Sequence, residues 1–334
     1  MGIKNNIIDI KNKQILFIGP VFFDYTKLII NDFEAKGAFV YFINEKRIGY
    51  WENILRRVSL RICKELTNKL MIKKINEAPD KVDIVFLIHG DLLNEFFMNF
   101  IKKKYKNSVF IMYQWDSVKN NKNTLFLSKY FDSIFSFDRT DCLDFGFNYL
   151  PNFYKKEKLE NKTSKPNIDL LFIGKGHTDR ISFLDKVKKN LPYYIKTKFV
   201  IQIPWYRYYF EKFIYKKRGS LLMKDFTFNK ISFNKVQQLT NQSKVILDIH
   251  NPWQNGLTQR PFDALGNGKA LITTNASIME ESFYDEEIIQ VINRDMPAIN
   301  SDIFKIDINI PHGFEEYSLE NWSKKIFKLT NNYD

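Results

Sequence analysis

The sequence predicts an α/β protein made of two Rossmann-like, doubly wound domains that face a central cleft. The chain has 334 residues, about twice the size of an average domain. Short apolar runs alternate with longer segments of helical periodicity, which is the pattern of parallel sheets covered by helices. A polar, lysine-rich stretch at 155–166 divides this alternation into two similar halves.

The first half carries five apolar runs of strand length. Gly19 and Pro20 end the first run and separate it from the next helix. The expected strands are 14–18, 39–44, 84–88, 109–114 and 133–137. The expected helices between them are 24–36, 51–75 and about 92–104. In the second of these helices, one face is expected to be apolar and consists of Ile54, Val58, Ile62 and Leu66. The cations Arg57, Arg61 and Lys64 lie off this face.

The second half repeats this alternation. Strands are expected at 168–173, 198–203, 245–249, 270–274 and 288–292, and the main helices at 180–190 and 319–329. From this pattern we expect a first domain at 1–155, a linker at 156–166 and a second domain at 167–315. A helical tail at 316–334 is expected to pack back toward the first domain. Ligands of doubly wound sheets bind beyond the carboxyl ends of the strands, so functional residues are expected directly after strands.

Composition excludes several classes of protein. Two cysteines, Cys63 and Cys142, cannot form a disulfide framework or a cysteine zinc site, and we expect reduced thiols in a cytoplasmic protein. No secretory signal and no apolar run of about 18 residues is visible. The net charge is +13, and 41 of the 51 basic residues are lysine. This excess predicts either a solvated surface or attraction to an anionic membrane or to phosphorylated substrates, whereas no motif predicts nucleic-acid binding.

The polar segment after the third strand of the second half predicts an anion site. Gly256-Leu257-Thr258 stands before a short helix, where unpaired backbone N–H groups and the helix dipole attract negative charge. Arg260 can bind two phosphate oxygens, and Asp263, one turn further, can accept hydrogen bonds from a ribose diol. The alternative is a capping loop in which Asp263 is a favourable first-turn acid.

A second strand-to-helix turn carries glycines and cations. Gly174, Lys175 and Gly176 end a strand, and the next helix begins near Arg180. A diphosphate could rest on this turn, neutralised by Lys175 or Arg180, or the glycines could serve only a tight turn. His177 lies in the same turn and could contact a phosphate or a base, but we expect its side chain to face solvent.

These motifs resemble the nucleotide-binding stretch of bacterial GT-B-fold glycosyltransferases of lipopolysaccharide and capsular polysaccharide biosynthesis. The matching residues are Gln254, Gly256, Leu257, Thr258, Arg260, Phe262, Asp263-Ala264-Leu265-Gly266, Gly268-Lys269 and Thr273-Thr274-Asn275. The segments 113–117, 131–132, 135–138, 150–154, 283–284 and 292–294 look similar as well, so the resemblance covers most of the chain. One departure is Asp263, which stands where that family has glutamate and whose carboxylate is one methylene shorter.

The resemblance implies a cytoplasmic enzyme, active at the inner face of the plasma membrane, that transfers a sugar from a nucleotide-sugar to a growing, lipid-linked cell-surface glycan. It places the donor on the second domain, at Gly174, Lys175, Gly176, Arg180, Gln254, Gly256, Leu257, Thr258, Arg260 and Asp263. The nucleotide-sugar is a co-substrate, and no cofactor is expected. No metal is expected either, since the four histidines are isolated, and cations and helix N-termini would stabilise the leaving diphosphate.

The first domain should then hold the acceptor and, if the reaction inverts configuration, a base that takes its proton. Four candidates follow strands: Asp24, His89, Asp91 and Asp116, with Asp116 ranked first. Asp116 could instead cap the next helix. His89 could have a purely structural role at the sheet edge, with its ring nitrogens hydrogen-bonded. Two other functions share these features, a sugar-nucleotide epimerase of the same fold and a non-enzymatic basic protein that binds membranes or polyanions. The sugar, base, acceptor, linkage, stereochemistry and oligomeric state stay open.

Membrane contact has its own candidate segment at 205–224, where aromatic residues alternate with cations. The aromatic residues are interleaved with Arg207, Lys212, Lys216, Lys217 and Arg218. Together with the helix at 56–74 and Lys102-Lys103-Lys104, this segment could rest on an anionic leaflet. The alternative is a surface helix whose aromatic side chains pack into the core.

Overall fold

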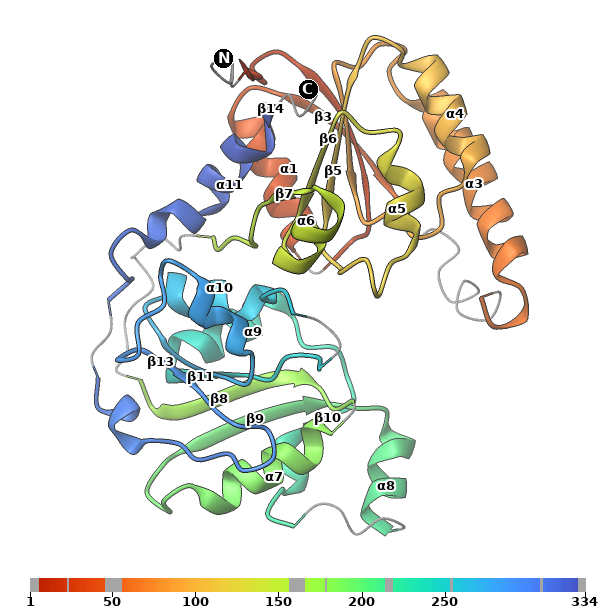
Figure 1. Ribbon diagram of the computed structural model, residues 1–334. Helices are drawn as coiled ribbons and strands as arrows, with labels where there is room; N and C mark the ends of the chain where they lie inside the picture. The colour runs from red at the N-terminus through yellow and green to blue at the C-terminus, as the bar shows by residue number, and fades with distance from the viewer. Residues whose placement is uncertain are drawn as a thin grey trace. The chain divides into compact units, whose positions relative to one another are not determined.

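The computed structural model describes residues 6–22, 24–45, 56–155, 166–177, 179–213, 219–252, 255–306 and 309–329. The chain forms two compact units (Figure 1). The first consists of Met1–Asn152, Pro252–Gly256 and Leu319–Asp334, and the second of Phe153–Asn251 and Leu257–Ser318. In the described part of the chain, no helix is long and apolar enough to cross a membrane.

The first unit is built on a six-stranded, fully parallel sheet, as the alternating pattern predicts. Its strand order is β3 (Phe39–Asn44), β2 (Gln14–Gly19), β4 (Ile84–Ile88), β5 (Val109–Gln114), β6 (Ser133–Ser136) and β7 (Asn148–Tyr149). The order reverses between β2 and β4, because β3 pairs on one side of β2 and β4 on the other. The carboxyl ends of β2 and β4 therefore form the switch point at which such sheets bind ligands.

Helices cover both faces of this sheet. They are α1 (Tyr25–Ala35), α3 (Leu60–Glu77), α4 (Glu95–Lys104), α5 (Asn123–Ser128), α6 (Arg139–Phe145) and α11 (Leu319–Ile326). On one face, α3 and α4 lie side by side over a core of strand residues such as Leu16 and Val85 (Figure 1). On the other, Trp322 of α11 packs edge-on against Phe86 and Tyr113. The short strand β1 (Asn6–Ile7) pairs antiparallel with β14 (Lys328–Leu329) in the same unit.

The predicted apolar face of the helix at 51–75 is not its core face. Its described part, α3, buries Cys63, Met71 and Ile75, whereas Ile62 and Leu66 are exposed. The buried face includes the polar side chain of Asn68, whose amide donates to the carbonyl of Leu92 at 2.8 Å. Ile54 lies outside the described residues.

The second unit has the strand order of a Rossmann fold. The order is β10 (Phe226–Thr227), β9 (Thr197–Gln202), β8 (Ile168–Lys175), β11 (Ser243–Asp248), β12 (Ala270–Thr273) and β13 (Ile289–Val291), all parallel. In chain order this is 3-2-1-4-5-6, so the switch point lies between β8 and β11. Its helices are α7 (Arg180–Asn190), α8 (Trp205–Phe213), α9 (Phe233–Asn241) and α10 (Gln259–Gly266).

The segment proposed for membrane contact is partly described. In α8, Tyr208 is buried, while Trp205, Tyr206, Tyr209 and Phe210 are exposed. The alternative, in which the aromatic side chains pack into the core, therefore holds for Tyr208 but not for the other four. The cations Lys216, Lys217 and Arg218 and the side chain of Lys212 lie outside the described residues.

Candidate active site

A strained turn follows β4 at the switch point of the first unit. His89 has a φ of +77° and Gly90 one of +74°, a conformation that is uncommon for any residue other than glycine. The turn is held from several sides, because the His89 carbonyl accepts hydrogen bonds from the amides of Gln114 at 3.1 Å and Asn121 at 3.0 Å. A Cβ atom on Gly90 would lie 2.8 Å from Cδ1 of Leu127. A strained backbone that several neighbouring groups hold in place is typical of a functional site.

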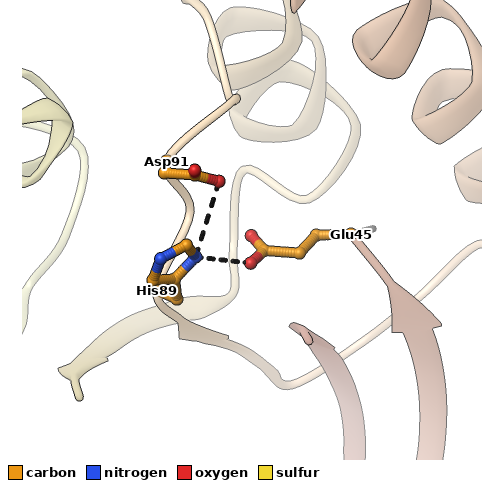
Figure 2. Close-up of side chains that lie close together, drawn as sticks. All are labelled: Glu45, His89 and Asp91. Carbon is orange, nitrogen blue, oxygen red and sulfur yellow. Dashed lines mark hydrogen bonds and ion pairs between the residues drawn. The ribbon is translucent and has the colours of Figure 1, made fainter. Parts of the chain in front are cut away.

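The buried carboxylate of Glu45 fixes the His89 ring. Glu45 comes directly after β3 and is 2% exposed. Its Oε1 lies 2.6 Å from Nδ1 of His89, and its Oε2 accepts the backbone N–H of Gly90 at 2.9 Å (Figure 2). An imidazole whose Nδ1–H donates to a carboxylate has its proton-accepting lone pair on Nε2. The pair therefore orients His89 as a base that acts through Nε2.

Two further carboxylates surround His89. Asp116 Oδ2 lies 3.4 Å from Nε2, and Asp91 Oδ1 lies 3.5 Å from Nδ1. Burial alone would lower the pKa of His89, but the hydrogen bond and charge of Glu45, with the charges of Asp91 and Asp116, raise the pKa above its ordinary value. The structure thus brings together three of the four predicted catalytic candidates, and Asp116 does not cap α5, whose N-cap is Lys122. The fourth, Asp24, occupies the N-cap position of α1 without a side-chain cap bond.

Glu45, His89 and Asp91 are also the residues that could hold a metal ion. Their ligand atoms all lie within 4.8 Å of one another. Two of the three are held by other groups, because Nδ1 of His89 pairs with Glu45 and Asp91 Oδ2 pairs with Arg56 Nη2 at 2.8 Å. The other Asp91 oxygen, Oδ1, is buried without a hydrogen-bond partner among the described residues. A cation here would have to displace the Nδ1 proton and compete with a guanidinium. The geometry therefore fits a carboxylate–histidine pair better than a metal site.

Aromatic side chains border this edge of the first sheet. The rings of Phe22 and Trp115 lie 5.5 Å apart, and those of Trp115 and Tyr113 lie 6.4 Å apart. Phe22 is exposed. The indole N–H of Trp115, which directly precedes Asp116, is buried. These rings give the base an apolar border of the kind that lines small-molecule sites.

The switch point of the second unit concentrates positive charge. Arg180, the first residue of α7, is 8% exposed and donates from Nη2 to the carbonyl of Ile249 at 2.5 Å. Its Nη1 lies 3.2 Å from Nε2 of His177, and its Nε is buried without a hydrogen-bond partner among the described residues. Burial and the charges of Arg260 and Arg294 lower the pKa of Arg180 to about 10. Three guanidiniums in one place favour an anionic ligand.

Arg260 and Arg294 are both anchored by acidic residues. Arg260 donates from Nη1 to Asp248 Oδ1 at 2.8 Å and from Nη2 to the carbonyl of Ile173 at 2.7 Å, so it ties the ends of β8 and β11 together. Arg294 binds Asp179 through two hydrogen bonds of 2.6 Å and also donates to the carbonyl of His250. Burial and neighbouring arginines lower the pKa of His250.

Burial and the charges of Arg180 and Lys175 also lower the pKa of His177. Both histidines of this site are therefore neutral around pH 7. Neither His250 nor Arg294 was among the candidates chosen from the sequence.

The glycines of this unit have packing roles. A Cβ atom on Gly176 would lie 2.6 Å from Cγ2 of Ile203, and one on Gly174 would lie 3.0 Å from Cζ of Phe172 and 3.4 Å from Nη2 of Arg260. Gly174 and Lys175 end β8, as the sequence predicts. The tight-turn alternative therefore accounts for Gly176 at least as well as an anion site does.

The predicted loop before α10 is only partly as expected. Gly256 belongs to the first unit, and its N–H donates to Asp138 Oδ2 at 3.2 Å, so the expectation of an available N–H at this residue is wrong. Thr258 is the N-cap residue of α10, and the Leu257 side chain is buried in the core of the second unit. Asp263 lies one turn into α10 and accepts a hydrogen bond from Gln259 at 3.3 Å. Gln254 lies outside the described residues.

Solved structures share this architecture. HepE from Anabaena, in complex with UDP and glucose, aligns with a TM-score of 0.52 and 10% identity over 95% of both chains. UDP-GlcNAc 2-epimerase from Neisseria meningitidis, bound to UDP-GlcNAc, aligns with a TM-score of 0.55 and 11% identity over 94% of this chain and 98% of that one. MurG from Acinetobacter baumannii aligns with a TM-score of 0.51 and 10% identity over 96% of this chain and 100% of that one.

No family model matches the chain, and no curated protein sequence matches it. At such low identity the structural likeness shows the fold, and it extends over nearly the whole chain. The chain therefore has the GT-B fold of these structures, which confirms the predicted α/β class with two Rossmann-like domains.

Proposed function

We propose that the protein is a glycosyltransferase that passes a sugar from a nucleotide-sugar to a growing cell-surface glycan of the lipopolysaccharide or capsule type. The observation that carries this proposal is the Glu45–His89 pair. A buried carboxylate holds the ring so that Nε2 stands at the switch point of the first sheet, where a base for an acceptor hydroxyl is needed.

The proposed reaction inverts configuration. The acceptor oxygen attacks the anomeric carbon of the donor sugar and gives its proton to Nε2 of His89. The bond between that carbon and the diphosphate oxygen breaks, and the diphosphate leaves with the electron pair. Glu45 stabilises the imidazolium that forms, and Asp116, 3.4 Å from Nε2, helps to orient the acceptor hydroxyl.

Residues of the second unit would hold the donor. Arg180 and Lys175 face the phosphates, with Arg294 as a third cation, and Asp263 binds the ribose. Arg260 contributes positive charge from its place between Asp248 and Ile173. With these cations the leaving diphosphate is stabilised without a divalent ion. HepE and the Neisseria epimerase support a uridine nucleotide as the first donor to test, since their structures contain UDP and UDP-GlcNAc.

A nucleotide panel and an acceptor test address the proposal. Thermal unfolding would be followed with nucleoside diphosphates and CMP. A ligand at 100 times its dissociation constant should raise the stability by about 2.7 kcal/mol. No shift with any nucleotide, together with binding to polyanions that falls steeply with salt, would indicate the non-enzymatic alternative.

An epimerase acting on a sugar nucleotide is the second candidate. The likeness to the Neisseria enzyme supports it, and a histidine flanked by carboxylates also suits proton transfer at a sugar carbon. The two functions differ in their need for an acceptor. A transferase releases free nucleotide only when a glycan acceptor is present, whereas an epimerase converts its substrate without one.

A further inference from the structure

The outer side of α3 carries a row of exposed apolar side chains. Val58, just before the helix, is 75% exposed, and Ile62, Leu66 and Leu70 are 49%, 41% and 43% exposed. Ile62, Leu66 and Leu70 follow one another at intervals of four within α3, which places them in one row along the helix. Val58 precedes them, beyond the extended N-cap residue Ser59. We call Val58, Ile62, Leu66 and Leu70 the α3 row. The opposite side of the helix packs on the core through Met71 and Ile75, so the α3 row lies outside that core.

Positive charge flanks the α3 row. Arg57, Arg61, Lys69 and Lys73 are all exposed. Residues 56–77 contain seven basic and two acidic residues. Of the two acids, Glu65 pairs with Arg61 at 3.2 Å and Glu77 with Lys74 at 2.8 Å. The helix thus offers apolar side chains and a net positive charge on the same accessible surface.

We propose that the α3 row is a membrane-docking surface that sets the first unit on an anionic lipid leaflet. A helix of 18 residues is about 27 Å long. Lying in the plane of the membrane, it would bury its apolar side chains among the acyl chains while its cations contact the lipid headgroups. A second copy of the chain fits this surface poorly, since two such surfaces would bring like charges together, and the whole chain carries +13. The inference does not depend on the proposed reaction.

Vesicle sedimentation of the full chain tests this assignment. The probes are vesicles of pure phosphatidylcholine and vesicles of phosphatidylcholine and phosphatidylglycerol in equal parts. We expect binding to the anionic vesicles, weakened by salt, and little binding to the neutral ones. Each basic residue near such a surface contributes about 1 kcal/mol, so a variant with Arg57→Gln, Lys69→Gln and Lys73→Gln should bind on the order of 100-fold more weakly. A variant with Ile62→Ser and Leu66→Ser should lose at least about tenfold.

Matched variants separate this surface from general charge and hydrophobicity. Lys27, Lys81 and Lys106 are exposed in the same unit, and their change to glutamine removes the same charge elsewhere. Leu143 and Met296, 86% and 79% exposed, serve as apolar controls when changed to serine. Controls that weaken binding as much as the α3 variants would overturn the proposal, and so would equal binding to neutral vesicles. A dimer that the α3 variants abolish, in a chain that ignores vesicles, would instead identify a second copy as the partner and also overturn it.

Discussion

The carboxylate of Glu45 lies 2.6 Å from Nδ1 of His89, although the two residues are 44 positions apart in the chain. The pairing arises because β2 separates β3 from β4 in the sheet, so residues just past the ends of β3 and β4 come together over it. Glu45→Gln removes the charge that stabilises protonated His89 and keeps the shape of the side chain. We expect turnover to fall by about 10- to 100-fold, as second-shell changes do, with nucleotide binding unchanged. Turnover as fast as that of the exposed control Glu34→Gln would contradict a positioning role for Glu45.

The raised pKa of His89 predicts the pH dependence of the reaction. A base must be neutral, so kcat/KM should fall as pH drops through the His89 pKa, with a midpoint above the ordinary value of 6.5. Glu45→Gln should move this midpoint to lower pH, and His89→Asn should remove the acid limb.

The contribution of His89 to the stability of the fold should be largest at low pH, where the activity is lowest. A raised folded pKa stabilises the protein below the unfolded pKa, and this contribution disappears as pH rises through the folded pKa. A pH profile unchanged by Glu45→Gln would contradict this account.

Removal of Arg260 should affect stability as well as binding. Asp248, its partner, is 1% exposed, and its other oxygen accepts a hydrogen bond from Thr273 at 3.1 Å. Arg260→Ala removes the guanidinium that is hydrogen-bonded to this buried carboxylate, which should cost about 1–3 kcal/mol of unfolding free energy. Adding Asp248→Asn should recover part of the loss. Urea unfolding of the single and double variants measures the coupling, and full additivity would show that the two side chains do not depend on each other.

Asp263 offers a test that separates ribose from phosphate. Asp263→Ala should weaken binding of the preferred nucleoside diphosphate, by about 1.5–3 kcal/mol if the carboxylate accepts ribose hydroxyls. Binding of inorganic diphosphate should hardly change. Arg294→Ala should weaken both ligands, because its guanidinium acts on phosphate. Calorimetric titration gives the four affinities. Equal loss for nucleotide and diphosphate in Asp263→Ala would move the ribose elsewhere.

Sequence periodicity predicted the two parallel sheets because buried parallel strands read as unbroken apolar runs, as at Ile84–Ile88. It was less informative for α3, because that helix buries Thr67 and Asn68 and exposes Ile62 and Leu66. The rule that functional residues follow strands predicted His89, Asp91 and Asp116. Applied to the strand at 39–44, the same rule would have suggested Glu45. The sequence contains no local sign that Glu45 and His89 meet, since only the strand order brings them together.

The packing of Trp322 against Phe86 has a consequence for the synthesis of the protein. The core of the first unit contains residues from 319–327, which the ribosome adds only after the entire second unit. The second unit can therefore complete its core during translation, while the first waits with Phe33, Phe86 and Tyr113 uncovered. Domains usually fold in the order of their synthesis. In this chain α11 emerges after the second unit and closes the unit that was begun first, so loss of residues 319–327 would harm the half that contains His89.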